Sequence, residues 1–154
     1  MTDAVHRYMT TCTWRGSTGA GYEAYDRSHD VDGLPAEATL ALSSDPAFGG
    51  DATRLNPEQL IVMAASSCQL LSFLAVAARA RIDVVDYQDI AEGEMPEDVH
   101  PMRITRIMLR PRIVIRGAVD ERRVRHLVDV AHRECFIANS LKTEVVIEPE
   151  VVTD

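Results

Sequence analysis

The sequence predicts an α+β fold, in which an antiparallel-rich sheet packs on two main helices. Two kinds of segment indicate it. Short runs rich in Thr, Tyr, Val and Ile, bounded by Gly, Pro and Asp, are typical of strands. Two longer stretches carry apolar residues at helical spacing and begin with capping residues. The expected order along the chain is β-β-β-α-β-β-α-β.

Size and charge limit what the protein can be. The chain has 154 residues, so we expect a single domain over residues 1–154. Asp and Glu number 24 against 16 Lys and Arg. This acidic balance argues against a nucleic-acid or anionic-membrane partner. The first residues are polar and lack the apolar run of a signal peptide, so we expect a cytoplasmic protein. Polar side chains interrupt the longest apolar stretch, 60–82, and we expect no transmembrane span there.

The first part of the chain is predicted to form three strands. Tyr8–Trp14 and Gly21–Arg27 are rich in Thr, Tyr and Trp, and a Gly-Ser-Thr-Gly turn separates them. They are typical of a hairpin. The alternating run Ala38–Leu42 follows a Pro-containing turn and predicts a third antiparallel strand.

A long helix, or two consecutive ones, is expected over 56–82. Asn56 suits the N-cap position, Pro57 the first turn, and Glu58 the positive end of the helix dipole. From Leu60 to Ala78 the apolar residues lie on almost every side, so the helix should be buried on most sides. A chain of this size can cover one side with its sheet. The opposite apolar side of the helix would then need a second subunit to cover it, so we expect a homodimer.

The remaining part of the chain, from Val84 onward, continues the sheet and adds a second helix. Pro111 indicates a bulge or an edge position in its strand, and Asp120 should cap the helix. The elements expected here are a strand at Val84–Gly93, a long strand at Met102–Arg116, a helix from Asp120 to about His132, a tight continuation at Cys135–Leu141, and a last strand at Thr143–Ile147.

The three cysteines are the residues that can carry chemistry. In a reducing compartment, thiols are buried structural residues, metal ligands or redox-active groups. Taken alone, Cys68 and Cys135 are each more typical of a core position, and Cys12 is expected to be structural. His132 lies three residues before Cys135, but no C-x-x-C or H-x-x-x-H spacing occurs. We therefore expect no metal site and no cofactor.

Two separated motifs change this interpretation of the cysteines. The first is Asn56-Pro57-Glu58-Gln59-Leu60, followed by Cys68. The second is AHRECFIANS at 131–140, which contains Cys135. Together they resemble the OsmC/Ohr family of organic hydroperoxide reductases, and Trp14-x-Gly16 and SSDPAFGGD at 43–51 fit its OsmC-like branch. The resemblance covers nearly the whole chain and implies an OsmC-like fold and an intertwined homodimer.

The resemblance also implies roles for individual residues. Cys68 would be the peroxidatic thiolate, and Cys135 the thiol that resolves its sulfenic acid to a disulfide. An external dithiol, a lipoyl protein in the family, would then reduce that disulfide. An arginine would lower the pKa of Cys68, and the matching carboxylate, Glu58, would hold it. Arg27 is our choice for this arginine.

Two arginines compete with Arg27, and helix geometry adds a constraint. Arg15 lies in the predicted hairpin, and Arg54 lies just before the first motif. Ten helical residues span about 15 Å, so Glu58 cannot touch Cys68 along one straight helix. We therefore expect the helix to break near Ser66-Ser67, which would place Cys68 by a helix N-terminus. The alternative is an arginine that bridges the gap.

The sequence leaves three functions open. The leading one is a thiol-dependent reductase of alkyl or fatty-acid hydroperoxides. The second is a redox sensor that keeps the cysteine pair but turns over little, and the third is a protein with inert cysteines that holds a small lipid. The apolar residues around Cys68 fit either a core or a greasy substrate pocket.

Overall fold

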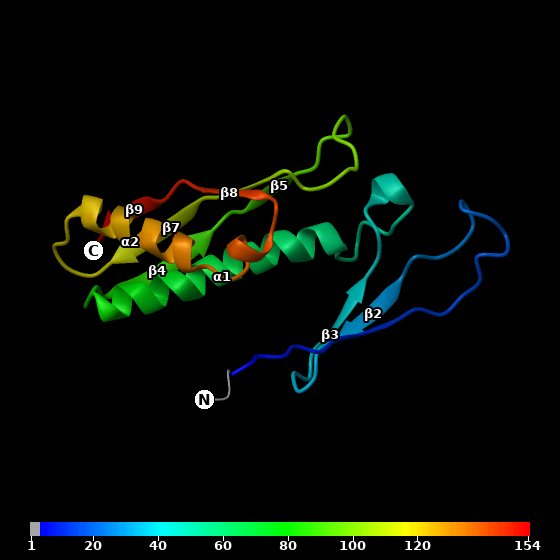
Figure 1. The fold of residues 1–154 in the computed structure, drawn as a ribbon, viewed down its shortest axis with the longest axis horizontal. Coiled ribbons are helices and arrows are strands. Elements are labelled where there is room, and N and C mark those ends of the chain that lie inside the picture. The colour runs from blue at the N-terminus through cyan, green and yellow to red at the C-terminus, as the bar shows by residue number, and fades with distance from the viewer. Residues whose placement is uncertain (1–3) are drawn as a thin grey trace. The chain divides into compact units, whose positions relative to one another are not determined.

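The computed structural model describes residues 4–154 and divides the chain into two compact units (Figure 1). The N-terminal unit ends at Leu60, and the C-terminal unit comprises Ile61–Asp154. Helix α1, Pro57–Arg79, begins in the first unit and continues into the second.

The N-terminal unit holds a three-stranded antiparallel sheet in the order β1-β2-β3. Its strands are β1 (Thr11–Thr13), β2 (His29–Asp32) and β3 (Thr39–Leu42), and a short 3-10 helix, η1 (Pro46–Phe48), follows. The third predicted strand is confirmed. The second lies later than predicted, because Gly21–Arg27 forms turns instead of a strand. Gly21 has φ +97°, and the carbonyls of Tyr22 and Tyr25 accept hydrogen bonds from the Arg27 side chain instead of from a strand.

The C-terminal unit contains two three-stranded sheets, β4-β7-β9 and β5-β6-β8. Each sheet joins one antiparallel and one parallel pair: β4 with β7 and β5 with β6 are antiparallel, and β7 with β9 and β6 with β8 are parallel. The elements are β4 (Val84–Asp89), β5 (Glu92–Glu94), β6 (Arg106–Leu109), β7 (Pro111–Ile115), α2 (Glu121–Glu134), η2 (Ala138–Ser140), β8 (Glu144–Ile147) and β9 (Glu150–Thr153).

Both long strands predicted in this unit are divided between the two sheets. The stretch 84–93 becomes β4 and β5, and 102–116 becomes β6 and β7, separated at Arg110. Pro111 is the first residue of β7, a position where its missing N–H is tolerated. The edge position suggested for it was wrong, because β7 is the central strand of its sheet. Strand β9 was not predicted.

A hydrophobic core joins the two helices to the β4-β7-β9 sheet. Phe73 and Val76 of α1, Ile113 of β7, and Val124 and Val128 of α2 are almost fully buried in it. Burying an aliphatic or aromatic side chain of this size stabilises the fold by about 1.5–3 kcal/mol. The predicted second helix is confirmed, and its cap is the one expected: the Asp120 carboxylate accepts a hydrogen bond from the N–H of Arg122.

Helix α1 is unbroken, and the break expected near Ser66-Ser67 was wrong. The Ser66 hydroxyl donates to the carboxylate of Asp89 on β4, and the buried Gln69 amide donates to the carbonyl of Val128 on α2. Both side chains thus donate to tertiary partners within a continuous helix, although the buried Oε1 of Gln69 accepts no hydrogen bond. The predicted N-cap is confirmed: Asn56 Oδ1 accepts from the N–H of Gln59, and Gln59 Oε1 accepts from that of Asn56.

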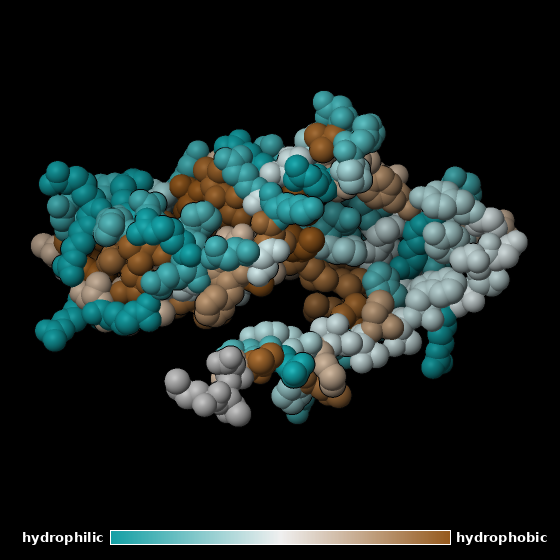
Figure 2. All heavy atoms as spheres, viewed as in Figure 1, coloured by the Kyte–Doolittle hydropathy of each residue, from teal (hydrophilic) through white to brown (hydrophobic). Residues whose placement is uncertain are grey.

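A second face of α1 stays exposed in the single chain. Leu71 is 64% exposed, and Ile61, Met63 and Leu74 are exposed as well. Figure 2 shows apolar side chains at the molecular surface. By length and composition α1 could cross a membrane, with 28% of its apolar window buried, although the core helix of a soluble protein meets the same criterion.

Candidate redox site

The structure brings Cys68 and Cys135 into contact. Cys68 lies half-buried in the middle of α1, and Cys135 directly follows α2 with 1% of its surface exposed. The thiol of Cys135 donates a hydrogen bond to the sulfur of Cys68. Two cysteines 67 positions apart in the sequence therefore lie side by side in the fold.

Further neutral donors surround the sulfur of Cys68. The backbone N–H groups of Ile137 and Phe136 and the hydroxyl of Ser72 also hydrogen-bond to it. Burial by itself raises the pKa of the Cys68 thiol, but these donors together with Cys135 outweigh burial and leave that pKa below its usual value. The local structure favours the thiolate, which is the nucleophilic form.

Cys135 has the opposite bias. Burial raises the pKa of its thiol, and its hydrogen bond to Cys68 raises the pKa further. The N–H of Ala138 donates to its Sγ at 3.5 Å, in the turn that leads into η2. Cys68 therefore ionises first, while Cys135 keeps its proton and donates it.

This arrangement differs from the expected one in what lies beside Cys68. The sequence predicted a cation there, but within Ile61–Asp154 the groups that lower the pKa of Cys68 are neutral donors. Ser72 was not predicted, although it lies one helical turn after Cys68 and could have been found from that spacing. The N–H groups of Phe136 and Ile137 could not have been found, since every residue type except proline has a backbone N–H.

Glu58 lies in the first turn of α1, partly exposed, in the N-terminal unit. In the part of the chain that the structure describes, it forms no ion pair with an arginine. Since α1 continues without a break from Glu58 to Cys68, these two side chains do not touch along the helix. Its role as a brace stays a prediction.

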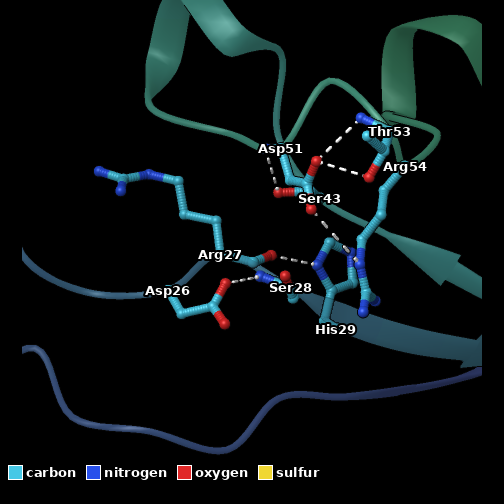
Figure 3. A network of polar contacts seen from close by, with 8 residues as sticks. All are labelled: Asp26, Arg27, Ser28, His29, Ser43, Asp51, Thr53 and Arg54. Carbon is cyan, nitrogen blue, oxygen red and sulfur yellow. Dashed lines mark hydrogen bonds and ion pairs between the residues drawn. The ribbon is translucent and has the colours of Figure 1, made fainter.

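Arg27 lies in the N-terminal unit, just before β2. Its guanidinium lies over the rings of Tyr25 and Tyr22, 4.0 and 4.7 Å from the two centroids, and donates to the carbonyls of the same residues at 3.0 and 2.7 Å. Figure 3 shows the side chain pointing away from the carboxylates of Asp26 and Asp51.

The two competing arginines lie nearby in the chain. Arg54 is close to the carboxylate of Asp51, with Nε and Oδ2 4.0 Å apart. Hydrogen bonds from the hydroxyl and N–H of Thr53 lower the pKa of Asp51. Arg15 is exposed after β1. Arg54 therefore has an acidic neighbour, whereas Arg27 is held by rings and carbonyls.

A pocket of about 540 Å³ opens beside Arg27 within the N-terminal unit. Aromatic side chains form much of its wall. Cys12, predicted to be structural, is exposed on β1 and lines this pocket. The lining residues are Cys12, Trp14, Thr18, Tyr22, Tyr25, Arg27, His29, Ser43, Ser44, Phe48 and Pro57.

Comparison with known families decides the assignment. The family model described as OsmC-like protein matches residues 49–150. This range includes Cys68, Cys135 and both motifs. The chain belongs to the OsmC-like family. No protein with a curated description matched the chain.

Solved structures of the family share the fold. An OsmC-like protein of unknown function from Vibrio cholerae is 28% identical, with a TM-score of 0.84 over 94% of this chain and 99% of that one. An organic hydroperoxide resistance protein OsmC from Legionella pneumophila is 19% identical, with a TM-score of 0.69 over 97% and 99%. An organic hydroperoxide resistance protein from Elizabethkingia anophelis is 17% identical, with a TM-score of 0.71 over 99% and 100%.

These relatives give the family's α+β fold. The predicted family and fold class are therefore confirmed. The individual roles of Cys68, Cys135, Glu58 and Arg27 stay predictions.

Proposed function

We propose that the protein is a cytoplasmic, thiol-dependent peroxidase that reduces organic hydroperoxides to alcohols. The observation that carries this proposal is the contact between Cys68 and Cys135, in which one pKa is lowered and the other raised. A structural pair of buried cysteines needs no such asymmetry. A peroxidatic thiolate next to a protonated resolving thiol does.

In the first step the Cys68 thiolate attacks the terminal oxygen of the hydroperoxide. The O–O bond breaks, and its electron pair leaves on the alkoxide, which takes up a proton to become the alcohol. The sulfur is oxidised to the sulfenic acid. The hydrogen-bond donors around Cys68 hold the sulfur in place for this attack.

In the second step the sulfur of Cys135 attacks the sulfenic sulfur of Cys68. A disulfide forms, and the hydroxyl leaves as water with the proton of Cys135. An external dithiol then reduces this disulfide by thiol–disulfide exchange and is itself oxidised. We propose a lipoyl protein for this reductant, and Glu58 and Arg27 as the carboxylate and cation of the site.

We further propose that the protein is a homodimer. Exposed apolar side chains on α1, led by Leu71, support it, because an apolar helix face of this kind is stabilised by contact with a second surface. Light scattering should give about twice the 17.1 kDa of one chain. A monomer at micromolar concentration would contradict the dimer without affecting the peroxidase proposal.

The alternative function is a redox sensor with the same cysteine pair. Measuring catalytic turnover distinguishes such a sensor from a peroxidase. The protein is treated with one equivalent of cumene hydroperoxide and analysed by non-reducing mass spectrometry. A Cys68–Cys135 disulfide, about 2 Da lighter, is expected. Continuous peroxide consumption with dihydrolipoamide supports the peroxidase, and a disulfide without turnover supports the sensor. An unchanged mass would contradict both, and Cys12→Ser serves as the matched cysteine control.

A further inference from the structure

The pocket of the N-terminal unit carries a charge unlike that of the whole chain. The protein has a net charge of −8. The pocket wall nevertheless contains the guanidinium of Arg27 and no carboxylate. Over residues 4–154, Arg27 has no acidic side chain within ion-pair distance. The positive charge in this pocket is therefore not neutralised by the protein.

The guanidinium is also fixed in position. The rings of Tyr22 and Tyr25 contact it and meet each other edge to face, with centroids 6.2 Å apart. Their carbonyls accept two of its five N–H groups. The other N–H groups are left to bind an acceptor. A cation held by rings and neutral carbonyls keeps its full charge, whereas a carboxylate partner would cancel it.

The motifs at the start of the chain build this arrangement. Trp14 packs edge to face on Tyr25, with centroids 6.3 Å apart, and its indole N–H donates to the carbonyl of Asp26 at 2.7 Å. A side chain at Gly16 would lie 2.7 Å from the Trp14 ring. Gly49 has φ +80°, and a side chain there would lie 3.0 Å from the Arg27 guanidinium. The glycines of W-x-G and SSDPAFGGD thus let the ring and the cation pack closely.

We propose that this pocket binds an organic carboxylate with an apolar body. The carboxylate pairs with the Arg27 guanidinium, and the apolar body packs on the aromatic wall formed by Trp14, Tyr22, Tyr25 and Phe48. A volume of about 540 Å³ lies within the range of small-molecule sites. The pocket shares Arg27 with the proposed peroxidase site, but every one of its residues lies in the N-terminal unit, so carboxylate binding there needs neither cysteine of the redox pair.

The fluorescence of Trp14 can report binding, since it is the one tryptophan of the chain and lines the pocket. Three ligands of similar shape are titrated while its fluorescence is followed: phenylpropionate, phenylpropanol and phenylpropylamine. We expect the carboxylate to bind about tenfold more tightly than the alcohol, because it alone pairs with the guanidinium. The amine should bind most weakly, and added salt should weaken the carboxylate most.

Substitutions in and near the pocket test which side chains give the preference for a carboxylate. Arg27→Gln should make the carboxylate and the alcohol bind equally. Arg15→Gln removes the same charge beside Trp14 but outside the pocket wall, and should keep the preference. Tyr25→Phe keeps the ring and should bind as the wild type does, whereas Tyr25→Leu should lose the preference. Calorimetry repeats each titration without relying on fluorescence, and circular dichroism verifies that each variant is folded.

All titrations are repeated in Cys68→Ser, which has no peroxidatic thiol. Unchanged binding in that variant is the expected result, and it would show that carboxylate binding needs no peroxidatic thiol. Equal affinity for all three ligands in the wild type would overturn the carboxylate site. So would a carboxylate preference that survives Arg27→Gln.

Discussion

The two units of the chain stabilise a negative charge by different means. In the C-terminal unit, neutral donors surround Cys68: a thiol, a hydroxyl and two backbone N–H groups. In the N-terminal unit, a full cation, Arg27, is held by aromatic rings and carbonyls. The first arrangement suits a small, half-buried sulfur, since each donor loses little solvation. The second suits a larger anion that arrives from solvent.

The units also differ in what holds them together. Almost the whole apolar core lies in the C-terminal unit, around Phe73 and Val128. Within residues 4–60 the buried side chains are those of Leu42, Ser43 and Asn56. The N-terminal unit relies on a short sheet, turns and stacked rings. Most of the core and the cysteine pair therefore reside in one unit, and the unpaired positive charge of Arg27 in the other.

The largest effect is expected from Cys68→Ser, which should abolish hydroperoxide reduction, because a serine hydroxyl does not become a nucleophilic anion at neutral pH. Peroxide consumption with a dithiol measures it. Cys12→Ser is the matched change in the N-terminal unit and should leave the rate unchanged. If Cys12→Ser were inactive and Cys68→Ser active, the assignment of thiol chemistry to the C-terminal unit would be reversed.

Phe73→Ala should lower the free energy of unfolding by about 3–5 kcal/mol, because it leaves a cavity between both helices and the β4-β7-β9 sheet. Denaturant unfolding measures the loss. Tyr8→Ala is the control in the N-terminal unit, where the side chain is 87% exposed, and should change stability little. Equal losses in the two variants would show that the core does not dominate the stability.

Asp120→Ala should cost about 1 kcal/mol of stability, because the carboxylate caps α2 through the N–H of Arg122. Thermal unfolding gives the change. Asp129→Ala removes the same charge from an exposed position within α2, where no cap is lost, and should cost less. If both variants lost the same stability, charge and not capping would explain the effect.

The smallest effect is expected from Ser72→Ala, which removes one hydrogen bond from the Cys68 thiolate and should raise the pKa of that thiol. At pH 7 a smaller fraction would then be ionised, so iodoacetamide should alkylate Cys68 about twofold to fivefold more slowly. The difference should vanish at alkaline pH, where both proteins are fully ionised. Ser67→Ala, exposed on the same helix, is the control. A faster reaction in Ser72→Ala would show that the hydroxyl stabilises the neutral thiol.

Local signals in the sequence determined much of this protein. Asn56 and Asp120 mark the two helix starts, because capping depends on residues within one turn. The two motifs that contain Cys68 and Cys135 were enough to give the family, since the match involves residue identity at fixed spacing. The α+β class followed from periodicity alone.

Tertiary contacts decided the rest. Helix α1 passes through Ser66 without a break because Asp89, 23 residues later, accepts its hydroxyl. The segment 21–27 leaves the sheet because Arg27 binds its carbonyls. The donors to Cys68 at Phe136 and Ile137 are backbone N–H groups, which all residues except proline have and no sequence pattern reveals. Local capping signals thus determined where the two helices begin. Contacts with residues distant in the chain determined that α1 continues past Ser66 and which groups surround the sulfur of Cys68.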